Sequence, residues 1–260
     1  MRDGIFPIFT KGRVVKTKSI EYLRDFPKDL ASLVFENYSD GVLFGFSIGI
    51  KEGNVLISNG AVKYQGDVLL IPAETVMLSG YGHLRHVKLV VGDRHETQDF
   101  ITRQIEIVVD GQEAKAENEL ELGRFCLNTG AKLRADKFDS FKYDSFDDLR
   151  TPENTLDITH VSYAGEGMPT LHPRILKEFA LALLMGPVDA VDTAFGLMCL
   201  NSAVVHKASI QWYVAKKEGS QYEDFSLSAL YDKLACLLPQ NDLANKPKKI
   251  QRRGPIITDW

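Results

Sequence analysis

The spacing of apolar residues changes once along this chain, near residue 165, and that change restricts the fold more than any other feature. Before it, short apolar runs alternate with Gly, Asn and Asp, whereas after it apolar residues recur every three or four positions. A period of two is typical of strands that bury one face, and the longer period is typical of amphipathic helices. The sequence therefore predicts an α+β fold in which the β part precedes the α part.

The first part predicts an antiparallel β-sandwich or meander. The run 42–50 (VLFGFSIGI) would place five apolar side chains on one face of a single strand, namely Val42, Phe44, Phe46, Ile48 and Ile50. Further strands are expected at 55–58, 61–65, 68–71, 75–78, 86–91, 102–109 and 119–127. The dipeptides Asn59-Gly60, Gly66-Asp67, Gly92-Asp93 and Asp110-Gly111 are typical of the turns that join antiparallel strands.

The second part predicts four short helices that form a small bundle or a layer on the sheet. The first helix begins at Pro173, and Gly186-Pro187 separates it from a second helix that runs to about Leu200. A third helix is expected at 202–217 and would end at Gly219. Ser226 would cap a fourth helix, which Pro239 would end.

Four regions follow from this pattern, and we expect the two termini to be extended. They are an N-terminal arm with a short helix that begins at Pro27 (1–37), an antiparallel β domain (38–165), a helical domain (166–240) and a basic C-terminal tail (241–260). Residues 131–165, which are rich in aromatic and acidic residues, are expected to form a surface loop at the end of the β domain.

The motifs of several enzyme classes are missing from the sequence. Neither GxxxxGK[ST] nor GxGxxG occurs, so nucleotide hydrolysis and dinucleotide binding have no support. GxSxG occurs once, as GFSIG at 45–49, but it lies inside the strand predicted over 42–50 and not at the strand-to-helix turn that a nucleophile elbow needs. Acidic residues of the loop, Asp144, Asp147, Asp148 and Glu153, could supply the carboxylate pair of a cell-wall hydrolase, but a solvated acidic surface is the simpler interpretation. We expect no catalytic residue and no cofactor.

Metal sites and disulfides are not expected either. His83 and His86 form an HxxH pair, but this spacing puts the two rings on opposite faces of a strand, so we expect ordinary surface or turn histidines. The three cysteines are distant from one another and form no CxxC pair, which favours a reducing compartment. The chain has no apolar segment that is long enough to span a membrane.

Charge is distributed unevenly along the chain. The net charge is −4, but residues 1–245 hold 26 basic and 34 acidic residues, so the body of the protein disfavours contact with nucleic acid. The last fifteen residues are basic, and they also carry large apolar side chains that would gain from burial. We expect the tail to dock onto a partner through Lys248, Lys249, Arg252, Arg253, Ile256, Ile257 and Trp260.

Two other groups of apolar residues are candidates for contact with other molecules. The N-terminal arm is very apolar for a chain end, and it would pack on the chain's own sheet or on a neighbour through Ile5, Phe6, Ile8 and Phe9. The aromatic-acidic loop offers rings that could stack on sugars, namely Phe138, Phe141, Tyr143 and Phe146.

Two segments resemble proteins of phage tails. Residues 119–184 contain ELELGRFCLNTGAKLR and then NTLDITHVSYAGEGMPTLHPRILKEFALALL, a pattern that resembles a baseplate protein family of Gram-positive prophages and R-type bacteriocins. Residues 39–72 (SDGVLFGFSIGIKEGNVLISNGAVKYQGDVLLIP) look like the β-modules of baseplate and fibre-attachment proteins. Members of that family are often labelled DNA and RNA helicases, a function that needs a nucleotide-binding loop, which this chain lacks.

The resemblance implies a structural subunit of a contractile tail or phage-tail-like particle, with other baseplate proteins (wedge, hub or fibre subunits) as partners. Such a protein would be made in the bacterial cytoplasm and released in the assembled particle on lysis. A receptor- or carbohydrate-binding module at the tail tip is the alternative, and an enzyme directed at the cell wall is a third possibility.

Overall fold

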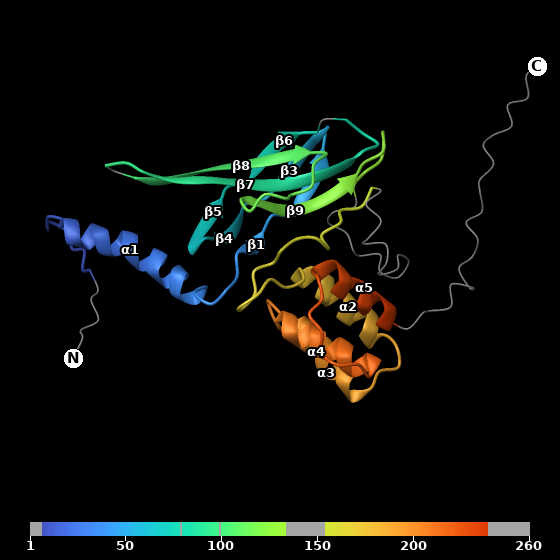
Figure 1. Cartoon of the computed structure of the whole chain (residues 1–260). Coiled ribbons are helices and arrows are strands. Elements are labelled where there is room, and N and C mark those ends of the chain that lie inside the picture. The colour runs from blue at the N-terminus through green and yellow to red at the C-terminus, as the bar shows by residue number, and fades with distance from the viewer. Residues whose placement is uncertain (1–6, 79, 99, 134–153, 239–260) are drawn as a thin grey trace, which may run out of the picture.

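The computed structural model describes residues 7–78, 80–98, 100–133 and 154–238, and it confirms the α+β architecture (Figure 1). Within these residues one helix, α1 (Thr17–Val34), precedes the strands, and four helices follow them. The strands are β1 (Gly41–Gly45), β2 (Ile48–Lys51), β3 (Asn54–Ile57), β4 (Gly60–Tyr64), β5 (Asp67–Ile71), β6 (Glu74–Met77), β7 (Leu84–Glu96), β8 (Ile101–Asp110) and β9 (Glu119–Cys126). The later helices are α2 (Pro173–Leu184), α3 (Ala190–Asn201), α4 (Lys207–Glu218) and α5 (Leu227–Leu237).

The strands form three antiparallel sheets of three strands each, in the orders β1-β4-β5, β2-β3-β6 and β8-β7-β9. The turn predicted at Gly66-Asp67 joins β4 to β5 one residue earlier, at Gln65 and Gly66, which both have positive φ, at 49° and 83°. That pair of positive φ values gives a turn whose twist matches the twist of the flanking strands.

The prediction of one strand over 42–50 is wrong, because the chain bends between β1 and β2. Gly45 and Phe46 have φ of 86° and 57°, so the alternation of faces is interrupted there. Phe46 is buried, whereas Phe44 is 49% exposed. The Phe46 ring lies directly over Gly60, where an added Cβ would stand 2.5 Å from ring carbons. Asn59-Gly60 is accordingly no hairpin turn but the place where the chain leaves β3 and enters the sheet of β4.

The third sheet contains the longest strands. The predicted turn at Gly92-Asp93 is wrong, because both residues lie inside β7, at an irregularity in its pairing with β8 between Val91 and Arg94. A β-bulge of this kind inserts residues without reversing the chain. The β7–β8 hairpin therefore extends to Glu96 and Ile101, and in Figure 1 its tip projects beyond the other strands, on the same side of the molecule as α1.

Residues 154–172 link the third sheet to the helices. The expectation of a surface loop over 131–165 is wrong for 154–165, where Leu156, Ile158, Val161 and Tyr163 are buried. Isolated bridges join Asp157 to Arg124 of β9 and Tyr163 to Val42 of β1, so this segment contacts the third sheet and the first sheet. Residues 134–153 lie outside the described part of the chain.

The later helices begin and end mostly where the sequence predicts. Pro173 opens α2, Gly219 ends α4 in a left-handed conformation with φ of 64°, and the Ser226 hydroxyl accepts from the Ala229 amide at the start of α5. The third predicted helix begins five residues late, at Lys207, because the His206 side chain caps it by accepting from the Ala208 amide. A continuous apolar core runs from the sheets through residues 154–172 into α2, α3, α4 and α5.

Candidate docking surface on helix α1

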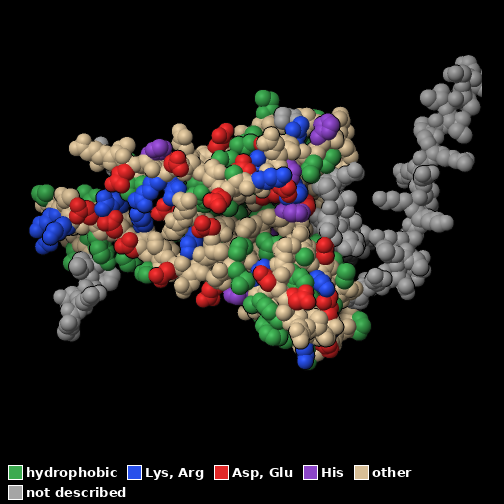
Figure 2. Space-filling model, viewed as in Figure 1, with side chains coloured by type: hydrophobic (Ala, Val, Ile, Leu, Met, Phe, Trp, Pro, Cys, Tyr) green, Lys and Arg blue, Asp and Glu red, His purple; other side chains and the backbone are tan. Residues whose placement is uncertain are grey.

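Helix α1 presents an apolar stripe to solvent. Its apolar residues follow the three- and four-residue spacing of one helix face, and each is about half exposed or more: Ile20 57%, Leu23 53%, Phe26 49%, Leu30 50%, Leu33 68% and Val34 58%. All eighteen residues of α1 are described, and none of them is buried. Figure 2 shows apolar side chains exposed along α1 at the left of the molecule, next to charged ones. Exposed apolar patches of this kind mark interaction sites.

The local sequence gives α1 little support as an isolated helix. The side chain of its N-cap residue, Lys16, makes no capping hydrogen bond, and the first turn holds no acidic residue that would favour the helix dipole. Pro27 lies inside the helix, where it removes a backbone hydrogen bond at a cost of about 3 kcal/mol. Helices this short gain most of their stability from packing of the apolar face. We infer that α1 needs a partner to cover it.

One end of α1 is attached firmly to the β part. The buried Lys63 side chain of β4 donates from Nζ to the carbonyl oxygens of Phe35, Glu36 and Tyr38, at 2.6, 2.8 and 2.6 Å. These carbonyls lie just past the C-terminus of α1, where a positive charge also complements the helix dipole. The lysine thereby uses all three of its donors. The rest of α1 extends away from the sheets and from the other helices (Figure 1).

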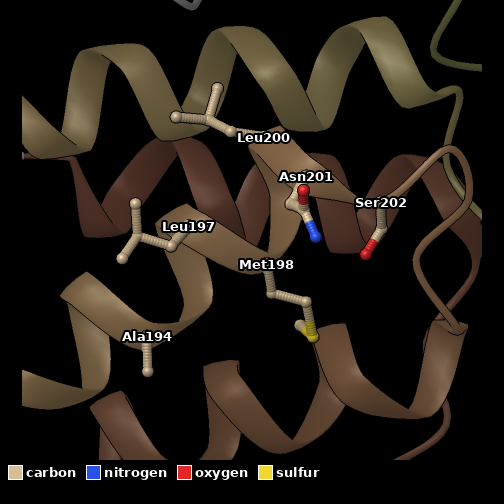
Figure 3. A pocket seen from close by; sticks show the side chains of 6 residues that line it. All are labelled: Ala194, Leu197, Met198, Leu200, Asn201 and Ser202. Carbon is tan, nitrogen blue, oxygen red and sulfur yellow. The ribbon is translucent and has the colours of Figure 1, made fainter.

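The helical part carries a second exposed apolar surface. On α3, Leu197 is 56% exposed and Leu200 is 36% exposed, and a shallow pocket lies along this face (Figure 3). The pocket is lined by Ala194, Leu197, Met198, Leu200, Asn201 and Ser202. On α4, Trp212 is 61% exposed, and its ring lies 5.1 Å from the ring of Tyr222. Large aromatic side chains of this kind are frequent anchors of protein interfaces.

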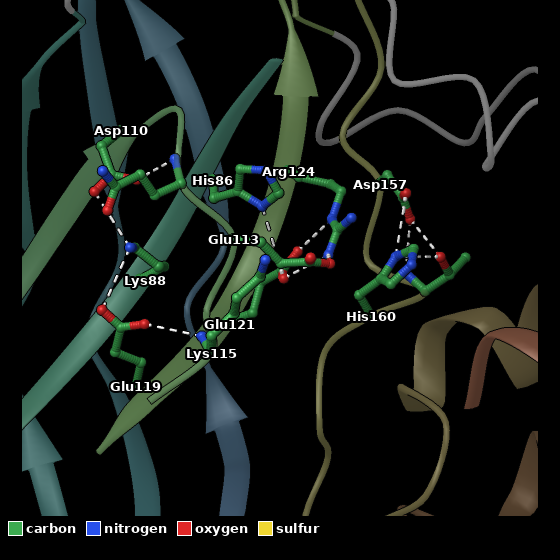
Figure 4. Close-up of polar contacts among 12 residues, drawn as sticks. His86, Lys88, Asp110, Glu113, Lys115, Glu119, Glu121, Arg124, Asp157 and His160 are labelled. Carbon is green, nitrogen blue, oxygen red and sulfur yellow. Dashed lines mark hydrogen bonds and ion pairs between the residues drawn. The ribbon is translucent and has the colours of Figure 1, made fainter. Parts of the chain in front are cut away.

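Charged side chains gather on one side of the third sheet, where several of them form ion pairs (Figure 4). Arg124 of β9 donates two hydrogen bonds to Glu121, Nε–Oε1 at 2.6 Å and Nη2–Oε2 at 2.7 Å. Its Nη2 also donates to Oε1 of Glu113. Lys88 of β7 lies between Asp110 and Glu119, with Nζ–oxygen distances of 3.2 and 3.4 Å. The carboxylates of Asp110, Glu113, Glu119 and Glu121 are thus each paired with a basic side chain, and such pairs hold the strands together.

The expectation of surface or turn histidines is wrong for His86. Its ring is buried, and Nδ1 lies 3.8 Å from Oε2 of Glu121. Burial lowers the pKa of His86, although the nearby Glu121 acts in the opposite direction. The ring is therefore neutral at neutral pH.

The described residues were searched for a metal centre, and the buried thiol of Cys199 was considered as a nucleophile. These residues hold no group of three His, Cys, Asp or Glu side chains that could bind a metal ion. Cys199 is buried in α3, and burial raises the pKa of its thiol to about 12. A thiol with so high a pKa is not a nucleophile at neutral pH.

Two solved structures are weakly similar to this chain. No protein-family model and no curated protein matches the chain. A solved structure described as "Crystal structure of TssK" is similar over 90% of this chain and 68% of that chain, with a TM-score of 0.38 and 8% identity. A chain of the type VI secretion system TssK-TssF-TssG baseplate subcomplex is similar over 88% of this chain and 98% of its own length, with a TM-score of 0.38 and 10% identity. Similarity at these scores carries no argument about what the chain does.

Most of the predicted docking residues lie outside the described residues. This holds for Ile5 and Phe6 of the N-terminal arm, for the loop aromatics Phe138, Phe141, Tyr143 and Phe146, and for the C-terminal residues Lys248, Lys249, Arg252, Arg253, Ile256, Ile257 and Trp260. Two residues of the arm are described, and both are exposed, Ile8 by 74% and Phe9 by 51%. In the described ranges no helix is both long and apolar enough to cross a bilayer.

Sequence reasoning missed the apolar stripe of α1. The expectation of a short helix that begins at Pro27 is wrong, because α1 begins ten residues earlier, at Thr17. Proline favours the first helical position, which made Pro27 look like a start. The spacing of Ile20, Leu23, Phe26 and Leu30 could have revealed the longer helix, since it continues through the proline with the helical period.

Proposed function

We propose that this protein is a structural subunit of the baseplate of a contractile phage tail or a phage-tail-like particle such as an R-type bacteriocin. It would join the baseplate wedge or hub to neighbouring subunits or to receptor-binding fibres, without breaking a bond itself. It would be made in the bacterial cytoplasm and leave the cell in the particle on lysis. The observation that carries the proposal is α1, a helix with an exposed apolar stripe and no buried residue.

The placement of the exposed apolar surfaces supports a connecting role. Helix α1 projects from the β part, whereas the exposed faces of α3 and α4 belong to the helical part (Figure 1). A protein with apolar surfaces on two separate parts can contact two neighbours at once. The resemblance of residues 39–72 and 119–184 to baseplate proteins supports a baseplate as the assembly in which it would do so.

Substitutions on α1 test the proposal in the assembled particle. Because Leu23 and Leu30 are about half exposed, the double change Leu23→Asp, Leu30→Asp should leave the fold stable to within about 1 kcal/mol. It should nevertheless remove the protein from purified particles, as measured by mass spectrometry. Ser32→Asp is the matched control, since it adds a charge at an exposed position on the opposite face of α1. Normal incorporation of the double variant would contradict the proposal.

The alternative, a receptor- or carbohydrate-binding module, has one observation in its favour. The exposed rings of Trp212 and Tyr222 form an aromatic surface, and the Tyr222 hydroxyl donates to the buried Gln211 side chain, which fixes that ring. If this surface binds a cell-surface sugar, Trp212→Ala should leave the protein in the particle but reduce binding of particles to bacteria. Unchanged binding would count against this alternative.

A further inference from the structure

We propose that the connection between β8 and β9 (111–118) is a flap that acid opens, because a proton on His86 beneath it is accommodated only when the flap is open. His86 lies on β7, the central strand of the third sheet, and its direct neighbours across the sheet are Asp110 of β8 and Arg124 of β9. Directly opposite residues of neighbouring strands point to the same face of the sheet. These three side chains therefore form one row on the face that carries the ion pairs (Figure 4).

The flap lies over this row and is held there weakly. Arg124 Nη2 donates to Oε1 of Glu113 in the flap at 3.2 Å, but the Glu113 side chain is 47% exposed. Exposed ion pairs of this kind contribute little to stability. Five residues of the flap line one pocket together with His86 and Arg124, namely Gly111, Gln112, Glu113, Lys115 and Ala116.

The closed flap leaves a charged His86 ring without a good partner. The side chain is 4% exposed, and its Nδ1 makes no hydrogen bond to any described residue. Oε2 of Glu121 lies 3.8 Å from Nδ1, but both oxygens of that carboxylate already accept from Arg124, at 2.6 and 2.7 Å. A proton on the ring would thus lie beside a guanidinium group and compete with it for Glu121. A buried charge that lacks a hydrogen-bond partner is costly.

The other charged groups around His86 do not remove this cost, because they are paired with one another. Lys88 of β7 lies between Asp110 and Glu119, and Arg124 holds Glu113 and Glu121. Lys115 of the flap adds a positive charge at the pocket, and the segment 154–172 adds Asp157, which contacts His160. Burial accordingly lowers the pKa of His86 from its ordinary 6.5, while Glu121 acts to raise the pKa and Arg124 to lower it.

Acid therefore favours the open flap. When the flap opens, water reaches the ring and its pKa returns toward 6.5. As the pH falls below about 6.5, the open form takes up a proton that the closed form does not, so the closed form loses stability. Hydrogen bonds from Arg124 and from the Lys115 amide lower the pKa values of Glu113 and Glu119 respectively. These carboxylates stay charged down to about pH 5, so the change between pH 7 and about pH 5 belongs to His86.

Hydrogen exchange of the full-length chain tests the flap. The amides of Lys115 and Ala116, which donate to Glu119, report the closed form. Their protection should fall about three- to tenfold between pH 7 and pH 5 in the wild type, since one group changes the equilibrium by at most about tenfold per pH unit. It should stay constant in His86→Gln, whose side chain does not titrate. The two proteins are compared at the same pH, because intrinsic exchange rates depend on pH. An equal loss of protection in both overturns the proposal.

A substitution in the flap tests the same coupling from the other side. Glu113→Gln removes the ion pair with Arg124, so the flap should open more readily and the pKa of His86, followed by nuclear magnetic resonance, should rise toward 6.5. Loss of the Glu113 charge alone would lower that pKa, so a rise identifies opening.

Glu117→Gln is the matched control, since it removes an exposed carboxylate from the same flap and leaves the ion pair of Glu113 intact. It should leave the pKa of His86 unchanged. If Glu113→Gln lowers this pKa or leaves it at the wild-type value, the flap does not govern the proton on His86 and the proposal fails. Either result leaves the function proposed for α1 as it stands, because α1 takes no part in the flap.

Discussion

His172 gives the fold a pH dependence that one substitution should remove. Its Nδ1 accepts from the Arg174 amide at the start of α2, and its ring packs edge-on against Tyr163 at 5.1 Å. Burial lowers the pKa of His172 from 6.5 to about 4. The unfolded chain therefore binds a proton between these values and the folded chain does not, so the free energy of unfolding falls as the pH drops from about 6.5 to 4.

The variant His172→Asn should keep the helix cap and lose the titration, since asparagine is a good N-cap. Between pH 7 and pH 4, the wild type should lose up to about 3 kcal/mol more stability than the variant. Urea unfolding of both proteins across this range measures the difference. Parallel curves for the two proteins would show that His172 titrates alike in the folded and unfolded chains.

Lys63 shows how a buried charge can be structural. Because all three Nζ donors are used by carbonyls past the end of α1, Lys63→Met should leave those carbonyls unsatisfied. We expect the free energy of unfolding to fall by about 3 kcal/mol. The exposed Lys51 of β2 is the control, and Lys51→Met should change stability by no more than about 0.5 kcal/mol. Equal effects of the two substitutions would disprove the role given to Lys63.

At the scale of the element, α1 should be stabilised by removal of its proline. Pro27→Ala restores the missing amide donor and should raise the stability of the helix by up to about 3 kcal/mol. The expected result is slower hydrogen exchange of the α1 amides, with no change in the exchange of the β7 amides. Unchanged exchange in α1 would mean that the helix is already covered and held by a partner.

Elements that depend on local chemistry could be predicted from the sequence. The starts at Pro173 and Ser226 and the stop at Gly219 need only the preferences of nearby residues, and they are confirmed, as is the turn between β4 and β5, which lies one residue before the predicted Gly66-Asp67. Gly92-Asp93 has the same local preference for a turn, but pairing with β8 continues past it. Long-range pairing therefore overrode the local signal.

The site was harder to predict than the fold. The three carbonyls that Lys63 binds are 25 to 28 residues away from it in the sequence, so no local pattern shows the contact. Burial of 154–165 is likewise set by the sheets it crosses. The spacing that gives the apolar stripe of α1 is visible in the sequence, but Pro27 suggested that the helix begins at residue 27.

At the scale of the whole molecule, the apolar core passes without a break from the sheets into the helices. Val87 of β7 and Phe125 of β9 are fully buried in the same core as Phe195 of α3, which stacks on Tyr213 of α4 at 4.0 Å. Parts that share a core lose packing together when either one unfolds. We therefore expect the β part and the helical part to unfold in one transition.

Two core substitutions and two probes can test this expectation. Phe195→Ala in the helical part should lower stability by about 3–5 kcal/mol, and Val87→Ala in the β part should lower it by about 1–3 kcal/mol. Each should shift the whole unfolding curve, whether the curve is followed by circular dichroism or by the fluorescence of Trp212. A Trp260→Phe background makes Trp212 the only tryptophan of the chain, so the signal reports on α4. If Val87→Ala moves the circular dichroism curve and leaves the Trp212 curve in place, the two parts fold independently, and the shared core contributes little to cooperativity.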